Sequence, residues 1–220
     1  MLNNIYIKPA QDDWPEFEMK SPVKIKLLQG TNVDKFNNLL EHDINDAKDR
    51  LNHKTAAKCY MTQWDMDQKY GSFKKLGELV INLAKTLPLA NATNENGDPR
   101  QYDYKVADSW GLIYTKGQMT KSHQHWPHIW SFTYCVKGCE SCAPLVFPDA
   151  SSLEIKPKKS QVVLWPAWIY HTVPEQKCDH KRIMAVGNLI VDWKKSLTSV
   201  TSHQLTPSPK GEKKCSIGTL

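Results

Sequence analysis

Apolar and polar positions in the first hundred residues predict a short strand followed by two helices. Residues 23–27 alternate apolar and polar side chains, which is the period of a half-buried strand. In residues 33–51, and again in 73–87, apolar residues recur every three or four positions, as on one face of a helix. We place the start of the second helix at Ser72, a favourable N-cap residue, and its end at Pro88.

From residue 110 onward the pattern changes to short strand-like runs separated by turn residues. Regularly spaced runs of this kind favour a β-sandwich or barrel, with the preceding helices packed on the outside of one sheet. The predicted strands are residues 110–114, 121–125, 129–136, 143–147, 153–155, 161–165, 169–173 and 182–193.

These elements predict one domain in three stretches. Residues 1–100 supply the strand and helices that pack on the core, and residues 101–195 supply the β-rich core itself. Residues 196–220 are rich in Ser, Thr, Lys and Pro, so we expect a flexible tail that buries too little apolar surface to become ordered.

Composition and charge exclude few classes of function. The chain has 220 residues with a net charge of +6, but its basic residues are scattered, which favours a solvated surface over a nucleic-acid site. No apolar stretch approaches the roughly 20 residues that span a bilayer, and the N-terminus lacks the pattern of a signal peptide. We therefore expect a cytoplasmic protein without membrane partners, and the sequence predicts no oligomeric state.

Cys139 and Cys142 form a Cys-x-x-Cys pair, which is half of a zinc-site motif. Cys135 and Cys178 are the candidate partners, but no second such pair follows in the sequence. A polar hairpin turn that carries thiols is therefore the favoured interpretation, with the zinc site as the alternative.

Three histidines form a candidate metal site. His123 and His125 are two positions apart on a predicted strand, so their side chains project from the same face. His171, on a strand that we assign to the opposite sheet, is the candidate third ligand. Three protein ligands leave coordination positions open, but imidazole suits iron, zinc, copper and nickel alike, and isolated His-x-His pairs are common.

Arg182 is the candidate anion-binding residue. It begins the predicted strand after His171, and we expect a hairpin to return it beside the His171 strand. A guanidinium that points into a barrel needs an anion, and a dicarboxylate can chelate a metal at one end and accept hydrogen bonds from arginine at the other. The alternative is an exposed turn residue near Asp179 and Lys181.

A series of sequence blocks between residues 110 and 190 shares its order and spacing with a known family. The blocks are Lys116-Gly117, His123-Gln124-His125, and residues 130–136, 145–149, 165–171 and 182–188, with a weaker echo at 61–64. In these blocks the chain resembles the 2-oxoglutarate/Fe(II)-dependent oxygenases frequent in phages and marine bacteria, which are related to the prolyl-hydroxylase-like branch of the double-stranded β-helix enzymes.

The resemblance implies a mainly β fold with flanking helices around a double-stranded β-helix core, a cupin-like jelly roll. It implies a dioxygenase that uses Fe(II), 2-oxoglutarate and O2, hydroxylates a substrate and releases succinate and CO2. By the same resemblance His123, His125 and His171 are the catalytic iron ligands and Arg182 holds the distal carboxylate of 2-oxoglutarate. Tyr134 is expected to be a second anchor for this co-substrate.

The chain differs from the family at two positions. The wider superfamily usually has a carboxylate where His125 stands, and a neutral imidazole leaves the metal site one negative charge poorer. Family members also tend to have a small hydroxyl residue where this chain has Met184.

Two other functions stay open at this point. One is a cupin-like metal-binding or sugar-binding module without oxygenase activity, and the other is a structural phage protein that kept the barrel but lost the chemistry. The primary substrate is not predicted: a protein side chain or a small molecule is favoured, and a nucleobase is the alternative. If the protein is viral, its expected location is the cytoplasm of the host cell.

Overall fold

The structure, a computed structural model, describes residues 22–47, 55–87 and 102–194 and contains two antiparallel β-sheets. The larger sheet has the strand order β1-β9-β6-β11-β4-β3. Its strands are β1 (Lys24–Leu27), β9 (Gln161–Pro166), β6 (Trp130–Lys137), β11 (Arg182–Val191), β4 (Tyr104–Tyr114) and β3 (Tyr60–Met61). The smaller sheet has the order β2-β5-β10-β7-β8. Its strands are β2 (Ala57–Lys58), β5 (Met119–His123), β10 (His171–Val173), β7 (Leu145–Phe147) and β8 (Leu153–Ile155).

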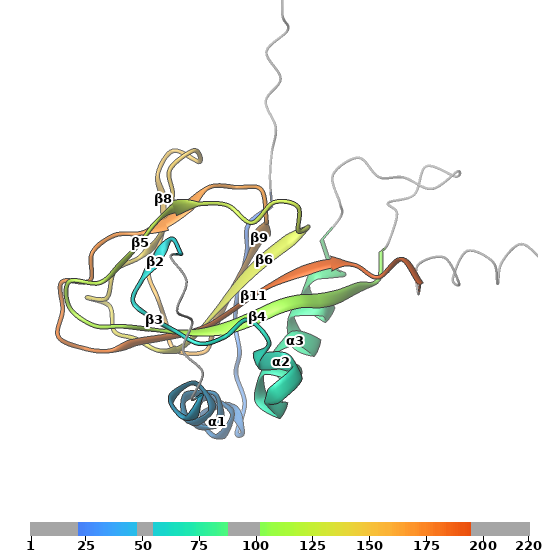
Figure 1. Ribbon diagram of the computed structural model, residues 1–220, viewed down its shortest axis with the longest axis horizontal. Helices are drawn as coiled ribbons and strands as arrows, with labels where there is room; N and C mark the ends of the chain where they lie inside the picture. Colours follow the sequence, from blue (N-terminus) through green and yellow to red (C-terminus); the bar gives the residue numbers. More distant parts are fainter. Residues whose placement is uncertain (1–21, 48–54, 88–101, 195–220) are drawn as a thin grey trace, which may run out of the picture.

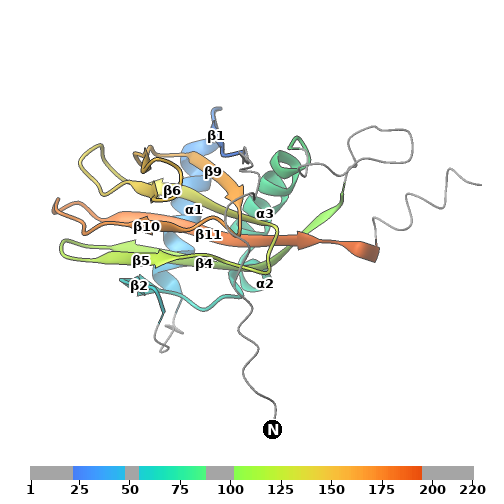
Figure 2. The same cartoon turned by 90° about the horizontal axis from the view of Figure 1, so that it is seen from above.

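Three helices cover the outer face of the larger sheet (Figure 1). They are α1 (Val33–Asp46), α2 (Met66–Lys69) and α3 (Gly71–Ala84), and Figure 2 shows α1 crossing the direction of the strands. None of the helices in the described ranges is long and apolar enough to cross a membrane.

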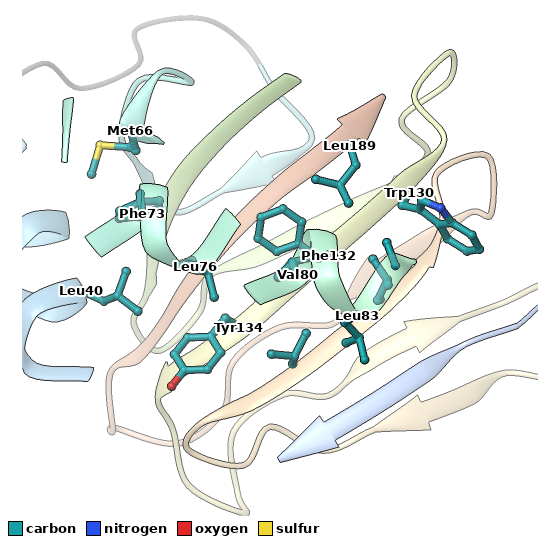
Figure 3. Close-up of a cluster of buried hydrophobic side chains, with 14 of the residues drawn as sticks. Leu40, Met66, Phe73, Leu76, Val80, Leu83, Trp130, Phe132, Tyr134 and Leu189 are labelled. Carbon is teal, nitrogen blue, oxygen red and sulfur yellow. The ribbon is translucent and has the colours of Figure 1, made fainter. Parts of the chain in front are cut away.

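One hydrophobic core lies between these helices and the larger sheet (Figure 3). The apolar faces of α1 and α3 pack there on alternate residues of β6, because successive side chains of a strand point to opposite faces. The fully buried members of this core include Leu40, Leu76, Phe132 and Tyr134.

A second hydrophobic core lies between the two sheets. It contains Trp110, Leu112 and Tyr114 from β4, which alternate with residues that face the helices. Gly111 is one of those intervening residues, and a Cβ built on it would lie 2.6 Å from Ile44 of α1. The close contact between helix and sheet therefore requires glycine at this position. Both faces of the central strands of the larger sheet are thus buried.

The predicted fold class is confirmed, and each of the eight strands predicted from residue 110 onward overlaps an observed strand. The short elements β2, β3 and α2 and the first half of β4 were not predicted. The second helix begins at Gly71, and the hydroxyl of Ser72 donates to the Asp43 carboxylate instead of capping the helix. The predicted tail, residues 196–220, lies outside the described residues.

Two predicted strand neighbours are wrong. His171 was assigned to the opposite sheet from His123, but β10 pairs with β5 within the smaller sheet. Arg182 was expected on a hairpin beside the His171 strand, but β11 crosses to the larger sheet and pairs with β4 and β6. The chain passes from one sheet to the other after β10, so the two residues approach each other across the interior rather than along one sheet.

Candidate functional site

The three predicted metal ligands come together where β5 pairs with β10. His123 lies opposite His171 in the register of the two strands, and His125 follows just after the end of β5. The ring centroids of His123 and His171 are 4.4 Å apart, and His125 lies 4.8 Å and 5.1 Å from them. Each ring offers one nitrogen, and the three nitrogens all lie within 4.8 Å of one another. They could therefore hold one metal ion between them.

Hydrogen bonds fix the orientation of two of these rings. Nδ1 of His123 lies 2.9 Å from the carbonyl oxygen of Lys121, and Nδ1 of His171 lies 3.2 Å from that of Ile169. A ring that donates from Nδ1 to a backbone carbonyl presents Nε2 as a lone pair for a metal.

Burial keeps the three rings neutral. Desolvation lowers the pKa of His123, lowers that of His125 to about 4, and holds that of His171 well below its ordinary value. The neighbouring rings lower the pKa of His125 and His171 further. Because a metal binds the neutral imidazole, the site does not first have to lose protons at neutral pH.

His128, the fourth histidine of this region, belongs to a different network. Its Nε2 lies 3.3 Å from Asp108, and hydrogen bonding to that carboxylate raises its pKa. Asn188 donates to the other oxygen of Asp108 at 2.7 Å and accepts a hydrogen bond from Ser131. This network gives Asn188 a structural role at the edge of the site.

Arg182 is buried, with 2% of its surface exposed, which rules out the exposed-turn alternative. Its Nε and Nη1 atoms have no hydrogen-bond partner among the described residues. The guanidinium carbon lies 4.9 Å from the ring centroid of Tyr114, which is opposite Arg182 in the β4–β11 register. A buried cation with unpaired donors is costly unless an anion binds it.

Tyr134 is not part of the site, which corrects the prediction that it is a second co-substrate anchor. Its side chain lies in the core beneath the helices (Figure 3). There its hydroxyl donates to Asn37 at 2.7 Å and its ring packs on Phe36. Trp130 and Phe132 face the same way, as predicted, but away from the site. The intervening Thr133 lies on the opposite face of β6 and lines the cavity.

Tyr114 is the tyrosine that the sequence analysis missed. It is fully buried between the sheets, and its hydroxyl lies 2.6 Å from the Thr120 hydroxyl. Its position two residues after Leu112 and four after Trp110 places all three on the inner face of β4. That alternation was visible in the sequence, but which face was internal was not.

A cavity of about 450 Å³ joins these groups. The three histidines, Arg182 and Tyr114 all line it. Trp165 adds a buried Nε1–H without a partner among the described residues, and its ring packs against His171. Trp64 and Trp126 also line the cavity while remaining 46% and 69% exposed, so they lie where it meets solvent.

The residues present fit a divalent metal together with a dicarboxylate. Three neutral imidazoles supply nitrogen ligands and leave coordination positions open. The unpaired donors of Arg182, in the same cavity, match the far end of an anion that reaches the metal.

No protein-family model matches the sequence, and no curated protein matches it. Solved structures, in contrast, are similar in fold. A prolyl hydroxylase from Trichoplax adhaerens, in complex with a hypoxia-inducible-factor peptide, has a TM-score of 0.56 at 14% identity over 80% of this chain and 86% of that chain.

Two further structures extend this similarity. HygX from Streptomyces hygroscopicus, with nickel and 2-oxoglutarate bound, has a TM-score of 0.55 at 8% identity over 79% of this chain and 84% of its own. A viral collagen prolyl hydroxylase from Paramecium bursaria Chlorella virus 1, as its 2-oxoglutarate complex, has a TM-score of 0.51 at 14% identity over 76% and 94%. The chain therefore has the double-stranded β-helix fold of the 2-oxoglutarate oxygenases.

Proposed function

We propose that the protein is a non-haem Fe(II) and 2-oxoglutarate-dependent oxygenase that hydroxylates its substrate. The observation that carries this proposal is the placement of an unpaired, buried guanidinium in the same cavity as three neutral histidines. The folds of HygX and of the prolyl hydroxylases support it. The matching sequence blocks favour the family frequent in phages and marine bacteria, and the free thiols suit a reducing compartment such as the cytoplasm.

In this proposal His123, His125 and His171 hold the iron. When bound, Fe(II) and 2-oxoglutarate supply the oxidative chemistry, in which O2 is consumed, 2-oxoglutarate is converted to succinate and CO2, and the substrate gains a hydroxyl group. The rings are held before any ligand binds, because their burial and backbone hydrogen bonds set both protonation and orientation.

Arg182 orients the co-substrate. Its Nε and Nη1 donate to the distal carboxylate, which gives the buried charge its counter-ion. Tyr114 supports the guanidinium with its ring and adds a hydroxyl near the same place. This hydroxyl substitutes for the small hydroxyl residue that the family has where Met184 lines the cavity here.

The substrate enters past Trp64 and Trp126. Exposed aromatic rings at the cavity mouth bind apolar or amphipathic groups, and a protein side chain or a small molecule fits such an entrance. The peptide in the Trichoplax prolyl hydroxylase complex favours a protein side chain.

The test is anaerobic reconstitution of the full chain with Fe(II), followed by titration with 2-oxoglutarate while the visible metal-to-ligand charge-transfer absorption is recorded. We expect the band in the wild type, its loss in His171→Ala, and a shift of the titration to higher concentration in Arg182→Ala. Tyr134→Phe is the matched control, because this tyrosine faces away from the cavity, and it leaves the band unchanged. Iron that binds without any band at saturating 2-oxoglutarate contradicts the proposal and favours a cupin-like metal-binding module.

A further inference from the structure

A second group of metal-ligating side chains lies outside the histidine site. Cys139 and Cys142 lie in the loop between β6 and β7, and Cys178 lies in the loop between β10 and β11. The sulfur of Cys139 lies 3.4 Å from that of Cys142 and 3.8 Å from that of Cys178, and the remaining pair is 3.6 Å apart. Nδ1 of His180 lies 3.5 Å from the Cys139 sulfur.

The three sulfur–sulfur distances are those of a tetrahedral zinc–thiolate site, whereas His180 is at such a distance from the Cys139 sulfur and lies outside the group of ligand atoms that are all within 4.8 Å of one another. Tetrahedral zinc with Zn–S bonds of about 2.3 Å places its sulfurs about 3.8 Å apart, and a histidine nitrogen about 3.6 Å from a sulfur. A disulfide bond needs two sulfurs about 2.05 Å apart. A disulfide-forming pair also does not account for a third thiol as close to both cysteines as they are to each other. The three thiols are mutually adjacent, and the distances between them are those expected for ligands of one metal ion.

The surroundings of the triangle are those of bound thiolates. Nε2 of Gln176, a residue without exposed surface, lies 3.2 Å from the Cys142 sulfur and 3.1 Å from the Cys178 sulfur. The backbone N–H of Cys139 donates to the Cys142 sulfur at 3.3 Å. N–H donors aimed at sulfur stabilise negative charge on it, and such outer contacts orient and tune metal ligands.

We propose that Cys139, Cys142 and Cys178 form a structural zinc site, with His180 as the fourth ligand. Thiolate-rich tetrahedral sites select zinc, and four protein ligands close the coordination shell, so the site stabilises the fold and does no chemistry. Cys178, one candidate partner of the Cys-x-x-Cys pair, joins the cluster. Cys135, the other, points into the core between the sheets and lies outside it.

The position of the site gives it a specific task. It joins the loop after β6 to the loop that leads into β11, and His180 lies two residues before Arg182. A metal bound here therefore fixes the start of the strand that carries the anion-binding arginine. The proposal does not depend on the oxygenase function, because the ligands are separate from the three histidines.

The test measures metal on the full chain, purified under reducing conditions, with the histidine site disabled by His171→Ala. In this background we expect about one zinc ion per chain by elemental analysis, and replacement by Co²⁺ that produces the intense visible absorption of a tetrahedral cobalt–thiolate centre. Cys142→Ser abolishes both signals. Cys135→Ala is the matched thiol control and retains them.

His180→Ala tests the site in a protein that still folds, because this side chain is exposed and its removal leaves the core intact. We expect it to weaken Co²⁺ binding by about tenfold or more while the protein stays folded. Three outcomes overturn the proposal: no metal beyond the histidine site, a cobalt spectrum without thiolate character, or a Cys139–Cys142 disulfide found by mass spectrometry in place of metal. An unchanged affinity in His180→Ala overturns the assignment of the fourth ligand.

Discussion

The cavity with the three histidines and the cluster of three cysteines are both polar sites, but they satisfy their polar groups differently. In the cavity, Arg182 and Trp165 keep buried N–H groups that have no partner among the described residues. In the cysteine cluster, the buried Gln176 uses both ends of its amide. Its Nε2 lies within hydrogen-bond distance of two sulfurs and of the His180 carbonyl oxygen, and its Oε1 accepts from the Ala143 N–H. The cavity holds buried donors that only a ligand can pair, whereas in the cysteine cluster the amide of Gln176 is already paired and the groups left for a metal are the sulfurs themselves.

This difference separates binding from structural support. A buried polar group that lacks a partner costs stability, so its retention indicates something that binds there. A buried group with every bond made contributes to the fold, and removing it exposes the cost of each partner left behind.

Gln176→Leu is expected to have the largest effect on stability. The change keeps the volume but leaves the Ala143 N–H and the His180 carbonyl without their bonds, so the free energy of unfolding falls by about 3 kcal/mol. Urea unfolding of the metal-free protein measures this loss. Gln161→Leu is the matched control, because this buried glutamine accepts a single bond from the Lys158 N–H, and we expect a loss of about 1 kcal/mol. If both variants lose the same free energy of unfolding, the Gln176 amide contributes no more to the fold than an ordinary buried glutamine.

Arg182→Met is expected to weaken 2-oxoglutarate binding by about 30-fold, roughly 2 kcal/mol, because the charge-assisted hydrogen bonds are lost. In the absence of co-substrate the same variant is more stable than the wild type, because an uncompensated buried charge has been removed. Calorimetric titration and thermal unfolding without ligand measure the two effects. Arg182→Lys keeps the charge but not the planar fork, so its affinity lies between the two. A ligand-free Arg182→Met that melts well below the wild type shows that the arginine supports the fold instead.

The pH dependence of the metal-free protein is the smallest expected effect. Burial lowers the pKa of His125 from 6.5 to about 4, and that of His171 is lowered as well. Between these pH values the unfolded chain binds protons that the folded chain does not. Stability is therefore complete above about pH 6.5 and falls as the pH drops towards 4. Unfolding in urea at a series of pH values measures this slope, and His171→Ala should flatten it. A flat wild-type profile means that the rings are already solvated.

The period of apolar residues predicted most of the helices and strands but not which face of a strand is internal. β6 is buried at seven of its eight positions, because helices cover one face and the smaller sheet covers the other. Alternation correctly grouped Trp130, Phe132 and Tyr134, yet both faces of β6 are buried, so the pattern does not show that Thr133 faces the cavity. The misassigned Tyr134 and the missed Tyr114 share this cause.

The remaining failures concern contacts between distant parts of the chain. His123, His125, His171 and Arg182 were identified from residue type and from family resemblance, and the structure brings them into one cavity. The hairpin expected between His171 and Arg182 did not form, because the chain changes sheets there, and strand order is not encoded in a local pattern. Cys178 joins Cys139 and Cys142 for the same reason, since two loops far apart in sequence meet only in the folded protein.

The pairing of β5 with β10 has a consequence for the quality of any preparation of this protein. His123 and His171 lie opposite each other, and side chains of a strand alternate between faces. A slip of one residue would turn one of the two rings out of the cavity while leaving much of the ladder of hydrogen bonds intact. The content of β-structure would scarcely differ between correctly and incorrectly paired molecules, whereas the three imidazoles converge only in the native register. The capacity of the three-histidine site for metal, measured apart from any metal on the cysteine cluster, is therefore a direct count of correctly paired chains.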